Sequence, residues 1–239
     1  MAPARLALAV LLALGLSAAV AQVAPSPAPA SLEHRSGLIA AWYPILLGRP
    51  AGAPELAYWA DLLTKYEAQA LAANLVRAAE AQGLVYRRIA TRALGSASDA
   101  AVAAWVANAP KHGQVRSDIR FELMNAPGLV RGKDTPQARV DGIYRLVLGR
   151  PATRVEQEGW ALAMARGMAR AGVMRHLASS DEGLRALCTA VWVEAMQRPP
   201  LEPELDHLFA LMRQGFCEED LLAGVLCSPE FQLRHRVPR

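Results

Sequence analysis

Apolar residues recur at intervals of three and four along most of the chain, which is the pattern of helices that bury one face. The clearest such segment carries the apolar residues Val140, Ile143, Tyr144, Val147 and Leu148. Asp134 or Thr135 can cap this helix, and Pro136 suits its first position because proline has no N–H to leave unpaired there. Alanine and leucine dominate the chain, and both favour helices. We therefore predict an all-α fold with almost no strand.

One set of sequence markers recurs after residue 36. The first and third copies carry an aromatic residue, a turn and a tryptophan at equal spacing: Tyr43, Gly48-Arg49-Pro50 and Trp59, then Tyr144, Gly149-Arg150-Pro151 and Trp160. The match in order and spacing indicates an internal repeat.

Two further copies are more divergent. The second copy has Gly95 and Trp105 but lacks the Arg-Pro pair. The fourth has Trp192 in the tyrosine position and then Arg198-Pro199, with His207 near the tryptophan position. The four turn positions are spaced 47, 54 and 48 residues apart.

Each copy predicts three short helices. The turn glycine supplies the left-handed residue that ends the first helix, and the following proline prevents its continuation. Helices of this length are marginal alone and must bury one face against neighbours. We therefore expect four tandem three-helix units forming one or two bundles, with helical domains at 37–133 and 134–234. The expected core aromatic residues are Tyr43, Trp59, Trp105, Tyr144, Trp160, Trp192 and Phe231.

The N-terminal residues read as an export signal. A basic start at Arg5 precedes an apolar run of about eleven residues and a small-x-small site that ends at Ala21, which is typical of a secretory signal peptide. We predict a signal peptide at 1–21, a Pro/Ala-rich linker at 22–36 and a basic tail at 235–239. The mature protein is expected to be exported and not to span a membrane.

Charge does not indicate a nucleic-acid partner. The formal net charge is +4 and the pI is near 9.2, and a basic protein attracts polyanions. However, the arginines are scattered among acidic residues, and export separates the chain from nucleic acid. We expect a protein or a cell-envelope polymer as partner instead.

The three cysteines fall in the last quarter of the chain. Cys217 and Cys227 lie at opposite ends of one predicted helix, roughly 15 Å apart and beyond disulfide reach. An oxidising compartment favours one disulfide, and an antiparallel second helix would bring Cys217 back near Cys188. We therefore favour a Cys188–Cys217 bridge with Cys227 buried, over a zinc site for which the spacing is wrong.

No constellation of residues indicates catalysis. Asp206 and His207 are neighbours on a helix and point about 100° apart, so they cannot act as a dyad. The Gly-Arg-Pro turns are candidate anion sites, but each arginine more often pairs with a nearby acid, here Asp61, Glu158 or Glu204. We predict no enzyme activity and no metal or other cofactor.

A methionine and arginine stripe in the third copy is the candidate interaction surface. Its residues are Met164, Arg166, Met168, Arg170 and Arg175. Such a stripe can line an adaptable groove for a partner helix. The alternative is core methionines flanked by solvated arginines.

The string from Ile143 to Pro151 with Trp160, and the ending Leu226-Cys227-Ser228-Pro229-Glu230-Phe231, resemble the bacterial family called domain of unknown function 4214, which is similar to phycobilisome linker domains. The resemblance covers roughly residues 39–234. It implies a helical module common in secreted and surface proteins, without established enzymatic activity and without a catalytic residue to carry over. The second copy lacks Arg-Pro and the fourth lacks the tryptophan.

The expected function is a non-enzymatic exported interaction or scaffold module that binds protein or envelope polymer through helical faces. Two alternatives remain, an envelope hydrolase and a small-ligand carrier with a pocket between the repeats. Converging acids or histidines in a pocket would favour the hydrolase, and a closed apolar cavity the carrier. Filled bundles with exposed apolar patches would favour the module.

Overall fold

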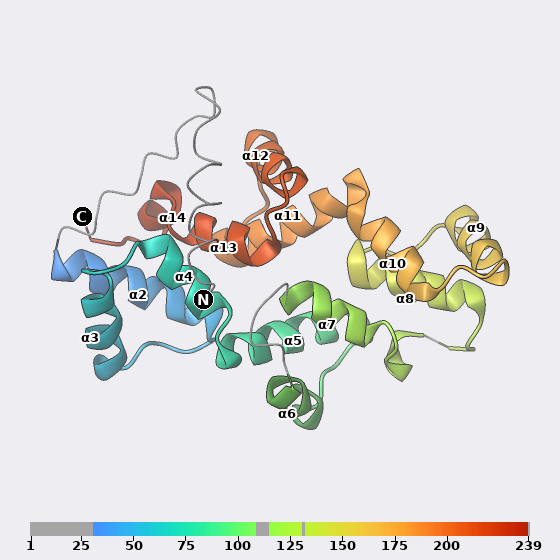
Figure 1. The fold of residues 1–239 in the computed structure, drawn as a ribbon, viewed down its shortest axis with the longest axis horizontal. Helices are drawn as coiled ribbons and strands as arrows, with labels where there is room; N and C mark the ends of the chain where they lie inside the picture. Colours follow the sequence, from blue (N-terminus) through green and yellow to red (C-terminus); the bar gives the residue numbers. More distant parts are fainter. Residues whose placement is uncertain (1–30, 109–114, 131, 239) are drawn as a thin grey trace, which may run out of the picture.

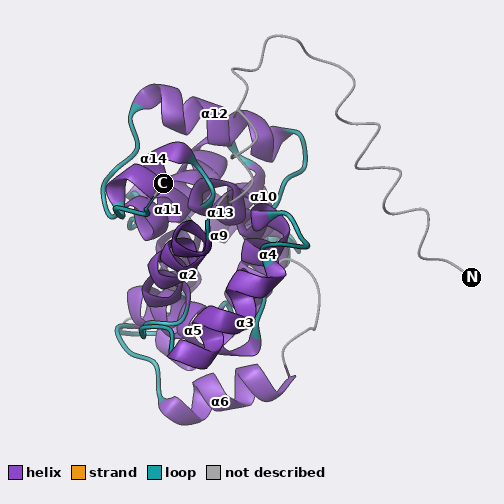
Figure 2. Ribbon diagram, turned by 90° about the vertical axis from the view of Figure 1, so that its left-hand side faces the viewer, coloured by secondary structure: helices purple, strands orange, loops and turns teal. Residues whose placement is uncertain are grey.

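A computed structural model of the chain describes residues 31–108, 115–130 and 132–238 (Figure 1). The predicted signal peptide and most of the predicted linker lie outside these ranges. Within them the structure has thirteen α-helices, one short 3-10 helix and no strand (Figure 2). The predicted all-α class is therefore confirmed. No helix among the described residues combines the length and the apolarity needed to cross a membrane.

The described helices can be taken in four groups of three along the sequence. Each group begins with the longest or joint-longest helix: α2 (Leu32–Leu46), α5 (Ala79–Leu94), α8 (Pro136–Val147) and α11 (Asp181–Met196). A second helix follows: α3 (Ala53–Leu62), α6 (Asp99–Asn108), α9 (Arg154–Ala165) and α12 (Glu202–Arg213). A third completes the group: α4 (Ala68–Val76), α7 (Val115–Leu123), α10 (Arg170–Ser179) and α13 (Glu218–Leu226). The 3-10 helix η2 (Pro127–Leu129) precedes α8, and α14 (Pro229–Arg234) ends the chain. That the groups are copies of one unit stays a prediction.

Local chemistry explains where the first helices begin and end. Thr135 is the residue that caps α8, and its hydroxyl accepts from the Ala138 N–H at 3.1 Å. Gly149 follows α8 with φ +72°, a left-handed conformation that glycine adopts without steric cost. Helix α2 begins at Leu32, earlier than the expected linker boundary at residue 36, because the Ser31 hydroxyl caps it by accepting from the His34 N–H at 3.0 Å.

The buried residues form two hydrophobic clusters. One joins α2 and α4 to α11, α12, α13 and α14, so it unites the first and the last helices of the described residues. The other joins α5, α6, α7, α8 and α10. The boundary expected between residues 133 and 134 falls inside this second cluster, which contains both Leu129 and Val140. Packing therefore divides the chain differently from the sequence-based domains.

The aromatic residues expected in the core are not equally buried. Five of them are buried: Tyr43, Trp105, Tyr144, Trp192 and Phe231. Trp59 and Trp160 are only half-buried at the edges of the clusters. Sequence analysis missed Trp42, which is fully buried and whose Nε1 donates to the Leu226 carbonyl at 3.0 Å.

The second helix of each group lies on the outside of the molecule. Helices α6 and α12 lie on opposite outer sides, and α9 lies at one end of the long axis (Figures 1 and 2). Each of these helices has one buried residue, namely Ala60 in α3, Trp105 in α6, Ala161 in α9 and Leu208 in α12. The fold thus leaves most of their side chains facing solvent.

Candidate functional site

The Gly-Arg-Pro turns place each arginine against an aromatic residue of the preceding helix. The guanidinium of Arg49 lies 5.3 Å from the ring centre of Tyr43, and that of Arg150 lies 5.2 Å from Tyr144. Arg198 has the same relation to Trp192, at 5.1 Å. These distances are within cation–π range.

The tyrosine and tryptophan of a copy are joined directly. Trp59 Nε1 donates to the Tyr43 hydroxyl at 2.8 Å, and Trp160 Nε1 donates to the Tyr144 hydroxyl at 2.9 Å. This hydrogen bond fixes the second helix onto the first at its polar edge, which is why both tryptophans are only half-buried.

Each turn arginine also binds two glutamates. The Arg150 Nη2 lies 2.8 Å from Glu156 Oε1, and its Nε lies 2.5 Å from Glu182 Oε1. Glu156 belongs to α9, whereas Glu182 lies in the first turn of α11. The arginine, which directly follows α8, therefore ties α8, α9 and α11 together at one point.

The same joint recurs at two other turns. Arg49 binds Glu55 and Glu80, and Arg198 binds Glu204 and Glu230. The second glutamate again lies in the first turn of a helix: Glu80 in α5 and Glu230 in α14. In the second copy, Gly95 is again left-handed at φ +88° but Ser96 follows it, so this copy has no arginine at the corresponding position.

Of the acids expected to pair with these arginines, only Glu204 does so. Asp61 instead pairs with Lys65, and Glu158 pairs with Arg154. A glutamate stands six residues after the turn arginine in all three joints, and this spacing was the signal that sequence analysis missed.

The charge of each arginine in these joints is paired with carboxylates. Hydrogen bonds from Arg49 and Arg150 lower the pKa of Glu55 and of Glu156, each to about 2. The same hydrogen bonds, together with those to Glu80 and Glu182, raise the pKa of both arginines. Since each guanidinium already faces two carboxylates, the turns serve as structural joints rather than as anion sites.

A second polar cluster is buried between the two hydrophobic clusters. Arg120 on α7 forms a two-pronged ion pair with Glu218 on α13, with Nη2 at 2.8 Å from Oε2. Arg116 Nη2 lies 2.8 Å from both carboxylate oxygens of Glu194, and its backbone N–H donates to Glu219 at 2.9 Å. Burial alone would lower the pKa of Arg116, but the charge of Glu194 raises it. This cluster holds α7 against α11 and α13.

The three cysteines are free thiols in the structure, so the predicted Cys188–Cys217 bridge is not formed there. Cys217 instead directs its Sγ to the carboxylate of Asp220, at 3.0 Å. Cys188 and Cys227 are buried. Burial raises the pKa of each of the three thiols to about 12, which disfavours the reactive thiolate.

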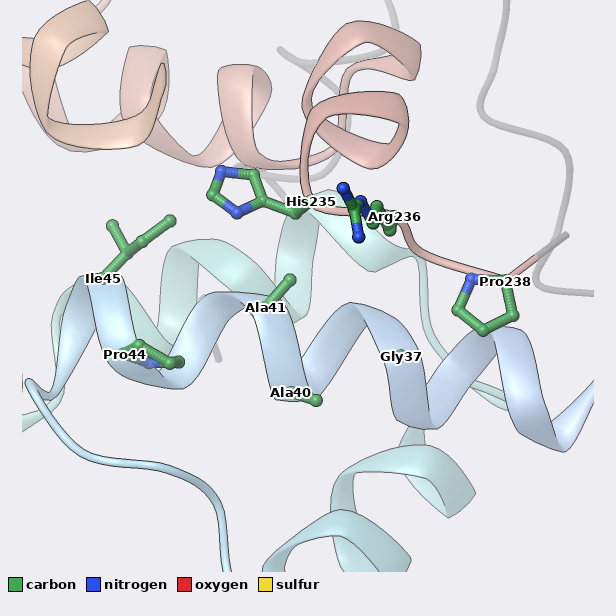
Figure 3. A pocket seen from close by; sticks show the side chains of 8 residues that line it. All are labelled: Gly37, Ala40, Ala41, Pro44, Ile45, His235, Arg236 and Pro238. Atoms are coloured by element: carbon green, nitrogen blue, oxygen red, sulfur yellow. The ribbon is translucent and has the colours of Figure 1, made fainter. Parts of the chain in front are cut away.

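A shallow pocket of about 340 Å³ lies between α2 and the C-terminal residues (Figure 3). Its floor is the α2 surface at Gly37, Ala40, Ala41, Pro44 and Ile45, and its rim is His235, Arg236 and Pro238. The His235 imidazole uses Nε2 to contact the Ala195 carbonyl at 3.2 Å. The lining therefore offers an apolar floor with one imidazole and one guanidinium, and no carboxylate to pair with that imidazole.

The remaining candidate catalytic and metal-binding residues do not form a common site among the described residues. Asp206 pairs with Arg185 on the neighbouring helix, while His207 is exposed. Across residues 31–108, 115–130 and 132–238, no group of three or more His, Cys, Asp and Glu residues is placed to hold a metal ion.

The candidate methionine and arginine surface is divided between core and solvent. Met164 packs against the second hydrophobic cluster, whereas Met168 is 43% exposed. Arg166 and Arg175 are exposed and Arg170 is half-buried.

No protein-family model, curated protein or solved structure matches this chain. The resemblance to domain of unknown function 4214 therefore rests on the sequence markers alone.

Proposed function

We propose that this chain is an exported, non-enzymatic interaction or scaffold module that binds protein or envelope polymer through its helical faces. The observation that carries the proposal is the placement of α3, α6, α9 and α12, each of which has a single buried residue. The other sides of these helices are free to meet a partner.

Two features make these helices suitable for binding. The arginine joints at Arg49, Arg150 and Arg198 tie α3 to α5, α9 to α11 and α12 to α14, so their outer faces are held in fixed positions. Apolar side chains are also exposed on them, including Tyr58 at 61% and Leu162 at 51%. Exposed apolar side chains grouped on one face favour association, because a partner removes them from water.

The test is affinity capture from a cell-envelope extract with the mature protein, eluted across a salt series. The outer-face variant is Tyr58→Ser with Val155→Ser and Leu162→Ser, and the control is Asn74→Ser with Thr91→Ser at exposed positions of α4 and α5. We expect the outer-face variant to lose the captured proteins or polymer and the control to retain them, with equal melting temperatures for both. Equal capture by both variants would overturn the proposal.

Export has its own test. We expect the chain recovered from the envelope fraction to begin at Gln22, which is the residue after the predicted cleavage site. Mass spectrometry of the intact protein measures this directly. A chain that retains residues 1–21 and stays in the cytosol would remove the exported part of the proposal.

A further inference from the structure

The outward side of α9 carries two exposed large apolar residues beside the exposed Arg154–Glu158 ion pair. Val155 is 79% exposed and Leu162 is 51% exposed. Gly159 lies between them, and a Cβ added there would meet nothing within 4 Å. The three residues are spaced four and three apart, so they share one side of the helix. A glycine within a helix costs about 1 kcal/mol relative to alanine, yet here it leaves open space on the outer side.

Helix α12 provides an internal comparison. It follows the same kind of arginine joint, and its residues correspond to those of α9 with an offset of 48. The corresponding positions hold Pro203, His207 and Ala210 in place of Val155, Gly159 and Leu162. The same local structure therefore forms without large apolar residues on this side, and the fold does not explain those of α9.

The corner between α9 and α10 carries positive charge that no described carboxylate pairs with, although the Arg175 Nε donates to the Ala171 carbonyl at 3.3 Å. Arg166, Arg170 and Arg175 form no ion pair with any described residue, whereas Arg139, Arg150 and Arg154 nearby in sequence are all paired. The charge of Arg170 contributes to a lowered pKa at Asp134, but that carboxylate binds Arg139 at 2.6 Å.

The other copies show that these arginines are also not required by the fold. At the position of Arg166 the fourth copy has Gln214, and at the position of Arg170 the first copy has Gln69. Unpaired arginines beside an exposed apolar stripe attract a partner with carboxylates next to its own apolar residues.

We propose, resting on the function proposed above, that the outer face of α9 together with the α9–α10 corner binds an acidic amphipathic helix of another protein. The apolar side of that helix lies along Val155 and Leu162. Gly159 permits close approach, because packed helix axes lie only about 8–10 Å apart. The carboxylates of the partner meet Arg166 and Arg170. A uniformly charged polymer would use the arginines and leave the apolar stripe uncovered.

The test uses a synthetic fluorescein-labelled peptide of about 20 residues, long enough to form a helix, with leucines at three and four residue intervals and glutamates elsewhere. Fluorescence anisotropy measures its binding to the full mature chain. The test variant is Leu162→Ala with Arg166→Gln and Arg170→Gln, which are the residues found at corresponding positions in other copies. The matched control is Ala210→Ser with Gln214→Ser on α12.

We expect the test variant to bind the peptide at least tenfold more weakly than the unmodified chain, and the α12 control to bind it unchanged. Replacing the peptide leucines with serine should weaken binding by at least tenfold as well. Thermal melts verify that both variants are folded.

Three results would overturn the inference. In the first, the test variant binds the leucine peptide as tightly as the unmodified chain does. In the second, the unmodified chain binds the serine peptide or polyglutamate as tightly as the leucine peptide. In the third, it binds vesicles of anionic lipid more tightly than the leucine peptide. Absence of peptide binding up to about 1 mM, the weak end of specific affinity, would also overturn it. If capture from envelope extract still depended on the outer faces in that case, the proposed function would stand and only this choice of partner would fail.

Discussion

The hydrogen bond from Trp42 to Leu226 joins α2, the first described helix, to α13 and can be tested by one substitution. Trp42 is fully buried in α2, and its Nε1 donates to the Leu226 carbonyl in the last turn of α13 at 3.0 Å. That carbonyl belongs to the helix end, where carbonyls have no partner within the helix. Trp42→Phe keeps an aromatic ring in place but removes the donor.

The expected loss has two parts. The smaller ring leaves packing contacts unfilled, which costs roughly 1 kcal/mol. A buried carbonyl that loses its donor costs a further 1–3 kcal/mol, approximately. The free energy of unfolding should therefore fall by about 2–4 kcal/mol, since the two contributions act at separate atoms.

Trp192→Phe is the matched control. Trp192 is also buried in the same hydrophobic cluster, but its Nε1 has no hydrogen-bond partner in the structure. This substitution loses packing and weakens the cation–π contact with Arg198 but breaks no hydrogen bond, and it should cost roughly 1 kcal/mol. The difference between the two variants isolates the hydrogen bond.

Urea unfolding followed by far-UV circular dichroism measures both variants, because that signal does not depend on tryptophan emission. We expect Trp42→Phe to have the lower midpoint with an unchanged slope. Equal free energies for the two variants, within about 0.5 kcal/mol, would refute a stabilising role for the hydrogen bond from Trp42 to Leu226.

Three further predictions concern the joints and the thiols. Arg150→Gln should lower the free energy of unfolding by about 1–2 kcal/mol, because it removes two ion pairs and a cation–π contact. The control is Arg154→Gln, at a 90% exposed side chain, which should not measurably change the urea midpoint. Equal midpoints for the two variants would contradict the role of the joint. Glu55 and Glu156 have a pKa of about 2 in the folded chain against an ordinary 4.5. Below about pH 4.5 the unfolded chain therefore binds more protons than the folded chain. The stability that these two carboxylates contribute is complete above about pH 4.5 and is lost as the pH falls toward 2. Urea midpoints between these pH values should decline in the unmodified chain and decline less in Arg150→Gln. The thiols of Cys188, Cys217 and Cys227, with a pKa of about 12, should react slowly with iodoacetamide at pH 8 in the folded chain and rapidly in urea; detection of a Cys188–Cys217 peptide under non-reducing conditions would show that the bridge forms after all.

Sequence reasoning worked best where one turn of chain contains the cause. Asp134 or Thr135 before Pro136 indicated the start of α8, and Gly149 before Arg150 and Pro151 indicated its end, because caps and left-handed residues act on neighbours within four positions. The recurrence of the Tyr-Gly-Arg-Pro-Trp markers likewise pointed to similar local geometry, which the hydrogen bonds of Trp59 and Trp160 display. A glutamate stands six residues after each turn arginine in the sequence, but only the geometry of the turn showed that the two side chains pair.

The sequence by itself determined the helical class, the turns that end the first helices and the absence of a recognisable catalytic motif. Only the tertiary structure decided that the first and last groups share one core, and that Arg116 and Arg120 bury their charges against Glu194 and Glu218. These contacts join residues as far apart as 184 positions. Apolar burial has no preferred direction, so the pattern of one helix states which face is buried but not which distant helix will cover it.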